Sequence, residues 1–92
     1  MQQVLQFNKT AIEEKLNHAA AYLGIENGYD GFYDYVGSLN KALNIPANLT
    51  ELGITNPDIE RLVKDALADP STGGNPIEMT ADNTKTLIEA CL

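Results

Sequence analysis

Residues 10–24 read TAIEEKLNHAAAYLG, and this stretch decides the fold class. Thr10 and Glu13 have the spacing of a capping box, in which two side chains bind the first unpaired backbone groups of a helix. Apolar residues then recur every three or four positions, at Ile12, Leu16, Ala19, Ala20 and Leu23. This spacing predicts a helix with one apolar face. Gly24 predicts the end of that helix, because glycine takes the left-handed conformation without strain.

The segments on either side of this helix are less regular. Residues 4–7 are apolar but too few to classify, and they fit either a frayed helix end or an extended segment. A second helix is predicted after residue 28 from an apolar stripe made by Phe32, Val36, Leu39 and Leu43. Gly31 and Gly37 are expected to weaken it, each by about 0.5–1 kcal/mol relative to alanine. Pro46 predicts its end, because the residue before proline avoids the helical region.

The second half of the chain predicts a capped turn at residues 48–51, ended by Gly53, and two more helices. One opens at residues 56–58, where Asn56 is the expected cap, and ends at Asp69. The other starts at Thr80. Strand-like alternation never extends beyond four residues. The sequence therefore predicts an all-α fold, with residues 1–92 as a single domain: a small bundle of about four helices plus a short turn.

Charge and composition exclude several classes of partner. Thirteen acidic and six basic residues give a net charge of −7. Nucleic acid is not expected as a partner, because its binding needs a basic surface that displaces counterions from phosphate. No apolar run approaches the roughly 20 residues of a membrane span. The single cysteine and the absence of a signal-peptide pattern at the start predict a cytoplasmic protein.

No complete catalytic or metal site is visible in the sequence. His18 is the one histidine, and no second ligand stands at metal-binding spacing from it. Because a metal site normally needs three or four ligands, we expect His18 to be an exposed or edge residue. Cys91 is expected to be a small buried apolar side chain, since no histidine accompanies it. We therefore assign no catalytic and no metal-binding residue.

One segment differs from the rest. Residues 71–76, Ser-Thr-Gly-Gly-Asn-Pro, join two predicted helices without a bulky side chain. Two adjacent glycines allow a ligand to approach the backbone closely, but they also suit an ordinary turn. Loops often carry function, so both interpretations stay open.

The order of these segments resembles the C-terminal helical domain of iron-dependent alcohol dehydrogenases, which have the dehydroquinate synthase-like fold. Residues 45–54, IPANLTELGI, resemble the family stretch GIP.tL.elGv. The later loop resembles the family pattern D-x-[CS]-T-x-x-N-P. Its matching positions are Asp69, Ser71, Thr72, Asn75 and Pro76, and Ile77 replaces the usual arginine. Residues 4–8 and the Leu23-Gly24 helix end also resemble the family, so the likeness covers nearly the whole chain.

This resemblance implies that the chain is the C-terminal part of a larger NAD(P)-dependent enzyme. Its expected partners are an N-terminal nucleotide-binding domain and metal-bearing helices. In the family, one aspartate and three histidines hold divalent iron, and all four lie upstream of the segment that resembles this chain. His18 matches none of them. The chain itself is therefore expected to hold no cofactor and to be inactive alone.

By the same resemblance, Ser71, Thr72, Gly73, Gly74 and Asn75 are expected to border the cleft for substrate or nicotinamide. The alternative is purely structural: Thr72 and Asn75 satisfy backbone groups of the turn.

A stand-alone, non-enzymatic module is the alternative function. One form is a carrier protein, for which residues 37–39, Gly-Ser-Leu, are the nearest match to the required Asp-Ser-Leu. Ser38 is predicted to fall in mid-helix and lacks the aspartate. Another form is an interaction domain kept for assembly. Helices that normally pack on a parent domain would expose apolar surface, so self-association is also expected.

Overall fold

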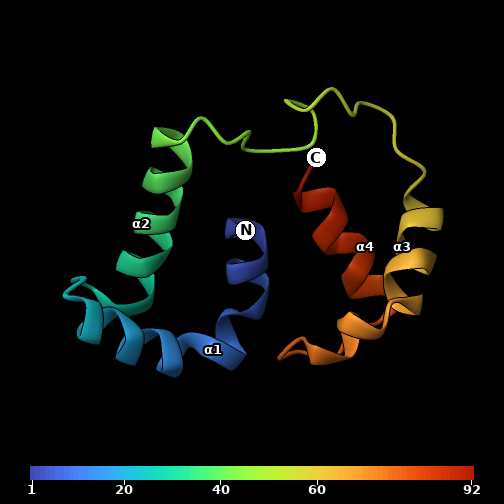
Figure 1. Ribbon diagram of the computed structural model, residues 1–92. Helices are drawn as coiled ribbons and strands as arrows, with labels where there is room; N and C mark the ends of the chain where they lie inside the picture. Colours follow the sequence, from blue (N-terminus) through green and yellow to red (C-terminus); the bar gives the residue numbers. More distant parts are fainter. The chain divides into compact units, whose positions relative to one another are not determined.

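The computed structural model describes residues 1–92 and contains helices but no strands, which confirms the all-α prediction. The elements are α1 (Gln2–Leu23), α2 (Gly28–Ala42), α3 (Ile59–Ala68), the 3-10 helix η1 (Pro70–Gly74) and α4 (Ala81–Ala90) (Figure 1). They fall into two compact units, Met1–Ala47 and Asn48–Leu92. The first unit pairs α1 with α2, and the second packs α3 against α4 and η1.

Helix α1 begins earlier than predicted. Its first residue is Gln2, so the prediction of a start at Thr10 is wrong, and residues 4–7 are helical. The N–H of Leu5 donates to the carbonyl of Met1 at 3.0 Å, and the Leu5 side chain is buried. Tertiary packing therefore extends the helix beyond its local start signal, since most helix stability in proteins comes from packing.

The predicted end of α1 is confirmed. Gly24 has a φ of 74°, in the left-handed region. Its N–H donates to the carbonyl of Ala21 at 3.2 Å, and the N–H of Ile25 donates to that of Ala20 at 2.8 Å. This pair of bonds is the Schellman motif, which satisfies carbonyls that the helix leaves unpaired.

The Asn17 side chain of α1 caps the first turn of α2. The Oδ1 atom of Asn17 accepts a hydrogen bond from the N–H of Tyr29 at 2.7 Å. The chain reaches this point through Asn27 and Gly28, whose φ values are 69° and 57°. A Cβ at Gly28 would lie 2.3 Å from Asn17 Oδ1, so a side chain there would displace the cap. The first turn of α2 therefore depends on α1.

At both glycines inside α2, another part of the chain comes close to the helix. A Cβ at Gly31 would lie 1.7 Å from the carbonyl oxygen of Glu26, and a Cβ at Gly37 would lie 2.3 Å from Nε2 of Gln2. The neighbour at Gly31 is backbone, which moves less readily than a flexible side chain. The helix nevertheless runs through both glycines to Ala42. A side chain at position 31 would therefore overlap its neighbour, so glycine fits there although it weakens the helix.

Tyr29 is the most buried large side chain of the first unit, with 2% exposure. Its ring lies 6.2 Å from the ring of Tyr33, and the Nζ atom of Lys9 lies 5.0 Å from its centroid. Lys9 also lies 3.6 Å from a carboxylate oxygen of Asp30. A cation over a ring face is attracted by the negative charge of the π-system. Lys9 therefore joins α1 to the start of α2.

In the second unit, α3 is capped by Asp58, so the prediction that Asn56 is the cap is wrong. The carboxylate of Asp58 accepts from the N–H of Arg61 at 3.2 Å. A cap must directly precede the first helical residue, and Asp58 directly precedes Ile59. The predicted end at Asp69 is confirmed.

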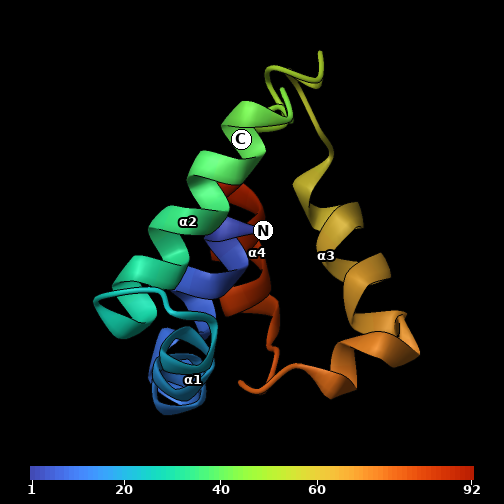
Figure 2. The same cartoon turned by 60° about the vertical axis from the view of Figure 1, so that its left-hand side comes forward.

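The other predicted boundaries of this unit are confirmed. Thr80 caps α4 and forms a capping box with Asn83. At residues 48–53, the Oδ1 atom of Asn48 accepts from the N–H of Glu51 at 2.9 Å, and Gly53 takes a left-handed φ of 90°. The turn is held to the end of the chain, because the hydroxyl of Thr50 donates to the Leu92 carbonyl at 2.7 Å. Figure 2 shows the path from α3 through η1 to α4.

We predict that Gly31→Ala lowers the free energy of unfolding by about 1–3 kcal/mol, since the new methyl group would overlap the Glu26 carbonyl. Helix propensity alone would make this substitution stabilising by about 1 kcal/mol, so a loss of stability must come from the steric overlap. Urea unfolding followed by circular dichroism measures it. Gly73→Ala is the matched control, because a Cβ there meets no atom within 4 Å. A Gly31→Ala variant as stable as the wild type would contradict the prediction.

The burial of Tyr29 predicts that the free energy of unfolding depends on pH in the alkaline range. Burial raises the pKa of its phenol, and the phenol of Tyr33 and the carboxylates of Asp30 and Glu13 raise it further. Its hydroxyl is buried without a hydrogen-bond partner. Because the pKa of Tyr29 is higher in the folded than in the unfolded state, its protonated phenol contributes fully to the free energy of unfolding below the unfolded pKa of about 10. This contribution is lost as pH rises through the folded-state pKa.

We therefore expect Tyr29→Phe to leave stability at pH 7 unchanged or slightly higher, since no hydrogen bond is removed. Above pH 10 the variant should lose less stability than the wild type. Urea unfolding at a series of pH values tests this. Tyr22→Phe is the control, because Tyr22 is 91% exposed. The interpretation fails if wild type and Tyr29→Phe have the same slope of stability against pH.

Candidate functional site

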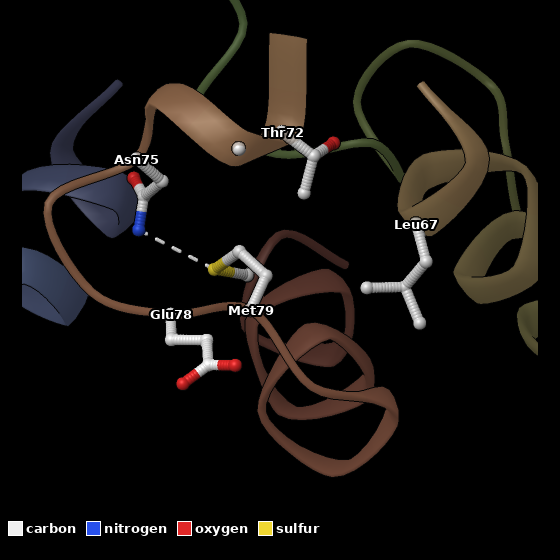
Figure 3. A pocket seen from close by; sticks show the side chains of 6 residues that line it. Leu67, Thr72, Asn75, Glu78 and Met79 are labelled. Carbon is white, nitrogen blue, oxygen red and sulfur yellow. Dashed lines mark hydrogen bonds between the residues drawn. The ribbon is translucent and has the colours of Figure 1, made fainter. Parts of the chain in front are cut away.

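An open hollow with a volume of about 360 Å³ lies in the second unit (Figure 3). The end of α3, the turn η1 and the segment before α4 surround it. Its lining residues are Leu67, Thr72, Gly73, Asn75, Glu78 and Met79. Three of the five predicted cleft residues, Thr72, Gly73 and Asn75, therefore line one hollow, whereas Ser71 and Gly74 are absent from its lining.

The segment that forms one side of this hollow is more regular than the sequence predicts. Residues 70–74 form the 3-10 helix η1. The carboxylate of Asp69 accepts from the N–H of Ser71 at 2.7 Å, and the N–H of Thr72 donates to the Asp69 carbonyl at 3.1 Å. Pro70 suits the first position because it has no N–H to satisfy. The segment predicted as a loop or turn from residue 71 is therefore a short 3-10 helix up to Gly74.

Thr72 and Asn75 both bind backbone. The hydroxyl of Thr72 donates to the carbonyl of Ala66, at 2.5 Å. The amide of Asn75 donates to the carbonyl of Ile77 at 2.8 Å and lies 3.3 Å from the sulfur of Met79. Figure 3 shows the methyl group of Thr72 directed into the hollow. These contacts supply the structural role that the sequence left open for both residues.

The surface left for a ligand is about equally polar and apolar. Leu67 lies on one side of the hollow, and Met79 turns its sulfur toward Asn75 on the other side (Figure 3). Glu78 is the one ionisable residue in the lining. No nucleophile stands beside a base there. Such a surface suits contact with a small molecule rather than a proton or group transfer of its own.

Three lining residues, Leu67, Glu78 and Met79, were not predicted. Leu67 reads as part of the apolar stripe of α3 in the sequence, but it is 38% exposed. Glu78 and Met79 come one residue after the predicted loop, and no motif marks them. Only the return of the chain from η1 toward α4 brings them opposite Thr72, so their proximity to the loop was the sole available signal.

The other candidate residues are not among those that line the hollow. His18 is exposed on α1, as predicted, and Ser38 is exposed within α2 rather than at the start of a helix. Cys91 is only partly buried, because it caps the end of α4, so the expectation of a buried side chain is wrong. No group of three or more histidine, cysteine, aspartate or glutamate side chains is placed to hold a metal ion. No helix is long and apolar enough to cross a membrane.

Residues 1–92, the whole chain, match the profile of the C-terminal part of the Fe-containing alcohol dehydrogenase family. The chain belongs to this family. The resemblance seen in the order of the sequence motifs is thereby confirmed, as is the helical fold expected of the family's C-terminal domain.

Two groups of curated relatives are similar to parts of this chain. The chain is 31% identical over 87 residues to the lactaldehyde reductases of Escherichia coli K12 and O157:H7. That match covers 87% of this chain and 23% of each reductase. It is 37% identical over 51 residues to alcohol dehydrogenase 4 of Saccharomyces cerevisiae, covering 55% of this chain and 13% of the relative. No solved structure matches the chain significantly. The chain thus spans about a quarter of the length of the reductases it resembles.

Proposed function

We propose that this chain is the C-terminal helical segment of an iron-dependent NAD(P) alcohol dehydrogenase and that it is inactive alone. In that role it packs against the metal-bearing helices and forms one wall of the substrate cleft. The family match over residues 1–92 carries this proposal. The hollow beside Thr72 supports it, because three residues assigned to the cleft by resemblance converge there.

The residues of this chain do not fit the iron that the family name implies. A divalent iron site needs several nitrogen and oxygen ligands around one point. His18 stands exposed on α1, and no cluster of potential ligands accompanies it. The metal and the nucleotide therefore belong, in this proposal, to the other part of the enzyme. The contribution of this chain is to shape the cleft and limit the access of water.

We predict no turnover when the isolated chain is supplied with ferrous iron, NADH and a short aldehyde. Adding Escherichia coli lactaldehyde reductase that has been truncated before its matched segment should give an NADH-oxidising complex. Loss of NADH absorbance measures activity, and gel filtration measures association. The truncated reductase alone is the control.

Two results would contradict this proposal. One is turnover by the isolated chain above the background of iron and NADH. The other is the absence of both association and activity after mixing, when the reductase's own C-terminal segment, added in the same way, restores them.

The two glycines of η1 test whether the hollow borders the cleft. A Cβ at Gly73 or Gly74 meets no atom of this chain within 4 Å, so neither alanine variant should change stability. Gly73 lines the hollow and Gly74 does not. In the reconstituted enzyme we expect Gly73→Ala to raise KM for the aldehyde, since its methyl group would occupy space needed by a ligand.

Gly74→Ala is the matched control and should leave KM unchanged. Steady-state kinetics on the reconstituted enzyme measure both. Equal KM values for wild type and both variants would show that Gly73 faces no ligand, and the role of residues 71–75 would then be structural.

A further inference from the structure

The link between α1 and α2 contains a dipeptide with a chemistry of its own, Asn27-Gly28. Asn27 is the one asparagine of the chain that is followed by glycine. Because Gly28 has no Cβ, its backbone nitrogen is unhindered and can attack the side-chain amide carbon of Asn27. Both residues have left-handed φ values, which asparagine and glycine tolerate best. The backbone of this link therefore favours the pair of residues that deamidates most readily.

The folded turn keeps the two reacting atoms apart. The ψ of Asn27 is 20°, so the nitrogen of Gly28 is nearly eclipsed with the backbone nitrogen of Asn27 itself. It is thereby turned away from Cβ of Asn27 and cannot reach Cγ, the atom one bond beyond.

Two hydrogen bonds fix this conformation. The N–H of Tyr29 donates to Oδ1 of Asn17 at 2.7 Å, and the N–H of Gly31 donates to the Asn27 carbonyl at 3.4 Å. Rotation about ψ of Asn27 would move the start of α2 away from both acceptors. The first turn of α2 must therefore open before Gly28 can attack.

We propose that Asn27 is a deamidation site that reacts only while the first turn of α2 is open. In the open form the Gly28 nitrogen loses its proton and bonds to Cγ of Asn27, and the side-chain nitrogen takes up a proton and leaves as ammonia. Water then opens the resulting cyclic imide at one of its two carbonyls. One product is aspartate, and the other is isoaspartate, whose main chain is one carbon longer. The net reaction consumes one water and needs no oxidant.

The two products have different effects on α2. Aspartate leaves the main chain unchanged and places a carboxylate at the N-terminus of α2, where the helix dipole favours negative charge. Isoaspartate inserts a methylene group ahead of Gly28, so the N–H of Tyr29 no longer meets Asn17 with α2 in its present place. The isoaspartate product therefore keeps this turn open.

The test measures how fast Asn27 deamidates in the 92-residue chain, by mass spectrometry of proteolytic fragments after incubation in mildly alkaline buffer. We expect the folded chain to react about tenfold or more slowly than the same chain in urea, because only open molecules react. Asn17→Ala removes the acceptor for Tyr29 and should speed the reaction of the folded chain about fivefold, the effect expected of a lost helix cap.

Asn48→Ala is the matched control. It removes an equivalent bond in the second unit, from the N–H of Glu51 to Oδ1 of Asn48 at 2.9 Å, and should react like the wild type. Asn17→Asp keeps an acceptor in place and should react no faster than the wild type. The proposal is overturned if folded and unfolded wild type react equally fast, or if Asn17→Ala reacts no faster than Asn48→Ala.

Circular dichroism checks that Asn17→Ala stays helical. If that variant unfolds, hydrogen exchange of the wild type decides instead: the factor that slows exchange of the Tyr29 N–H should match the factor that slows deamidation. A Tyr29 N–H that exchanges as fast as in the unfolded chain, while deamidation stays slow, would show that this turn does not control the reaction.

Discussion

The end of α3 at Asp69 and Pro70 is the constraint on which the candidate site depends. The carboxylate of Asp69, which follows the last residue of α3, accepts the N–H of Ser71 at 2.7 Å. Pro70 disfavours the helical conformation at Asp69, so α3 ends there, and that bond stabilises the first turn of η1. The Thr72 hydroxyl donates back to the Ala66 carbonyl. Without this reversal Thr72 and Met79 would not face one another across the hollow. The hollow is therefore a consequence of one helix end.

Each compact unit rests on a small core. In the first unit only Leu5, Ala20, Tyr29 and Val36 are buried apolar residues, and in the second only Val63 is. Short chains bury a small fraction of their surface and are correspondingly marginal. Individual hydrogen bonds therefore have a large share in holding these helices, such as the cap that Asn17 of α1 gives to α2. Membership in a family of longer enzymes is consistent with so small a core.

Several features were predictable because they depend on neighbouring residues alone. The end of α1 at Gly24 and the start of α4 at Thr80 follow from local hydrogen bonds. The predicted start of α1 at Thr10 was wrong because burial of Leu5 extends the helix. The predicted cap at Asn56 was wrong by two residues because two good capping residues flank Pro57, and only the backbone conformation chooses between them.

The sequence by itself determined that the chain is helical, where most helices end and which family it belongs to. These properties depend on apolar spacing, capping side chains and motif order, which are local or linear. Only the tertiary structure decided that Leu67, Glu78 and Met79 join the predicted loop around one hollow. It also decided which apolar side of α2 is buried against α1. Both outcomes depend on how segments distant in sequence pack together, and no local pattern encodes that.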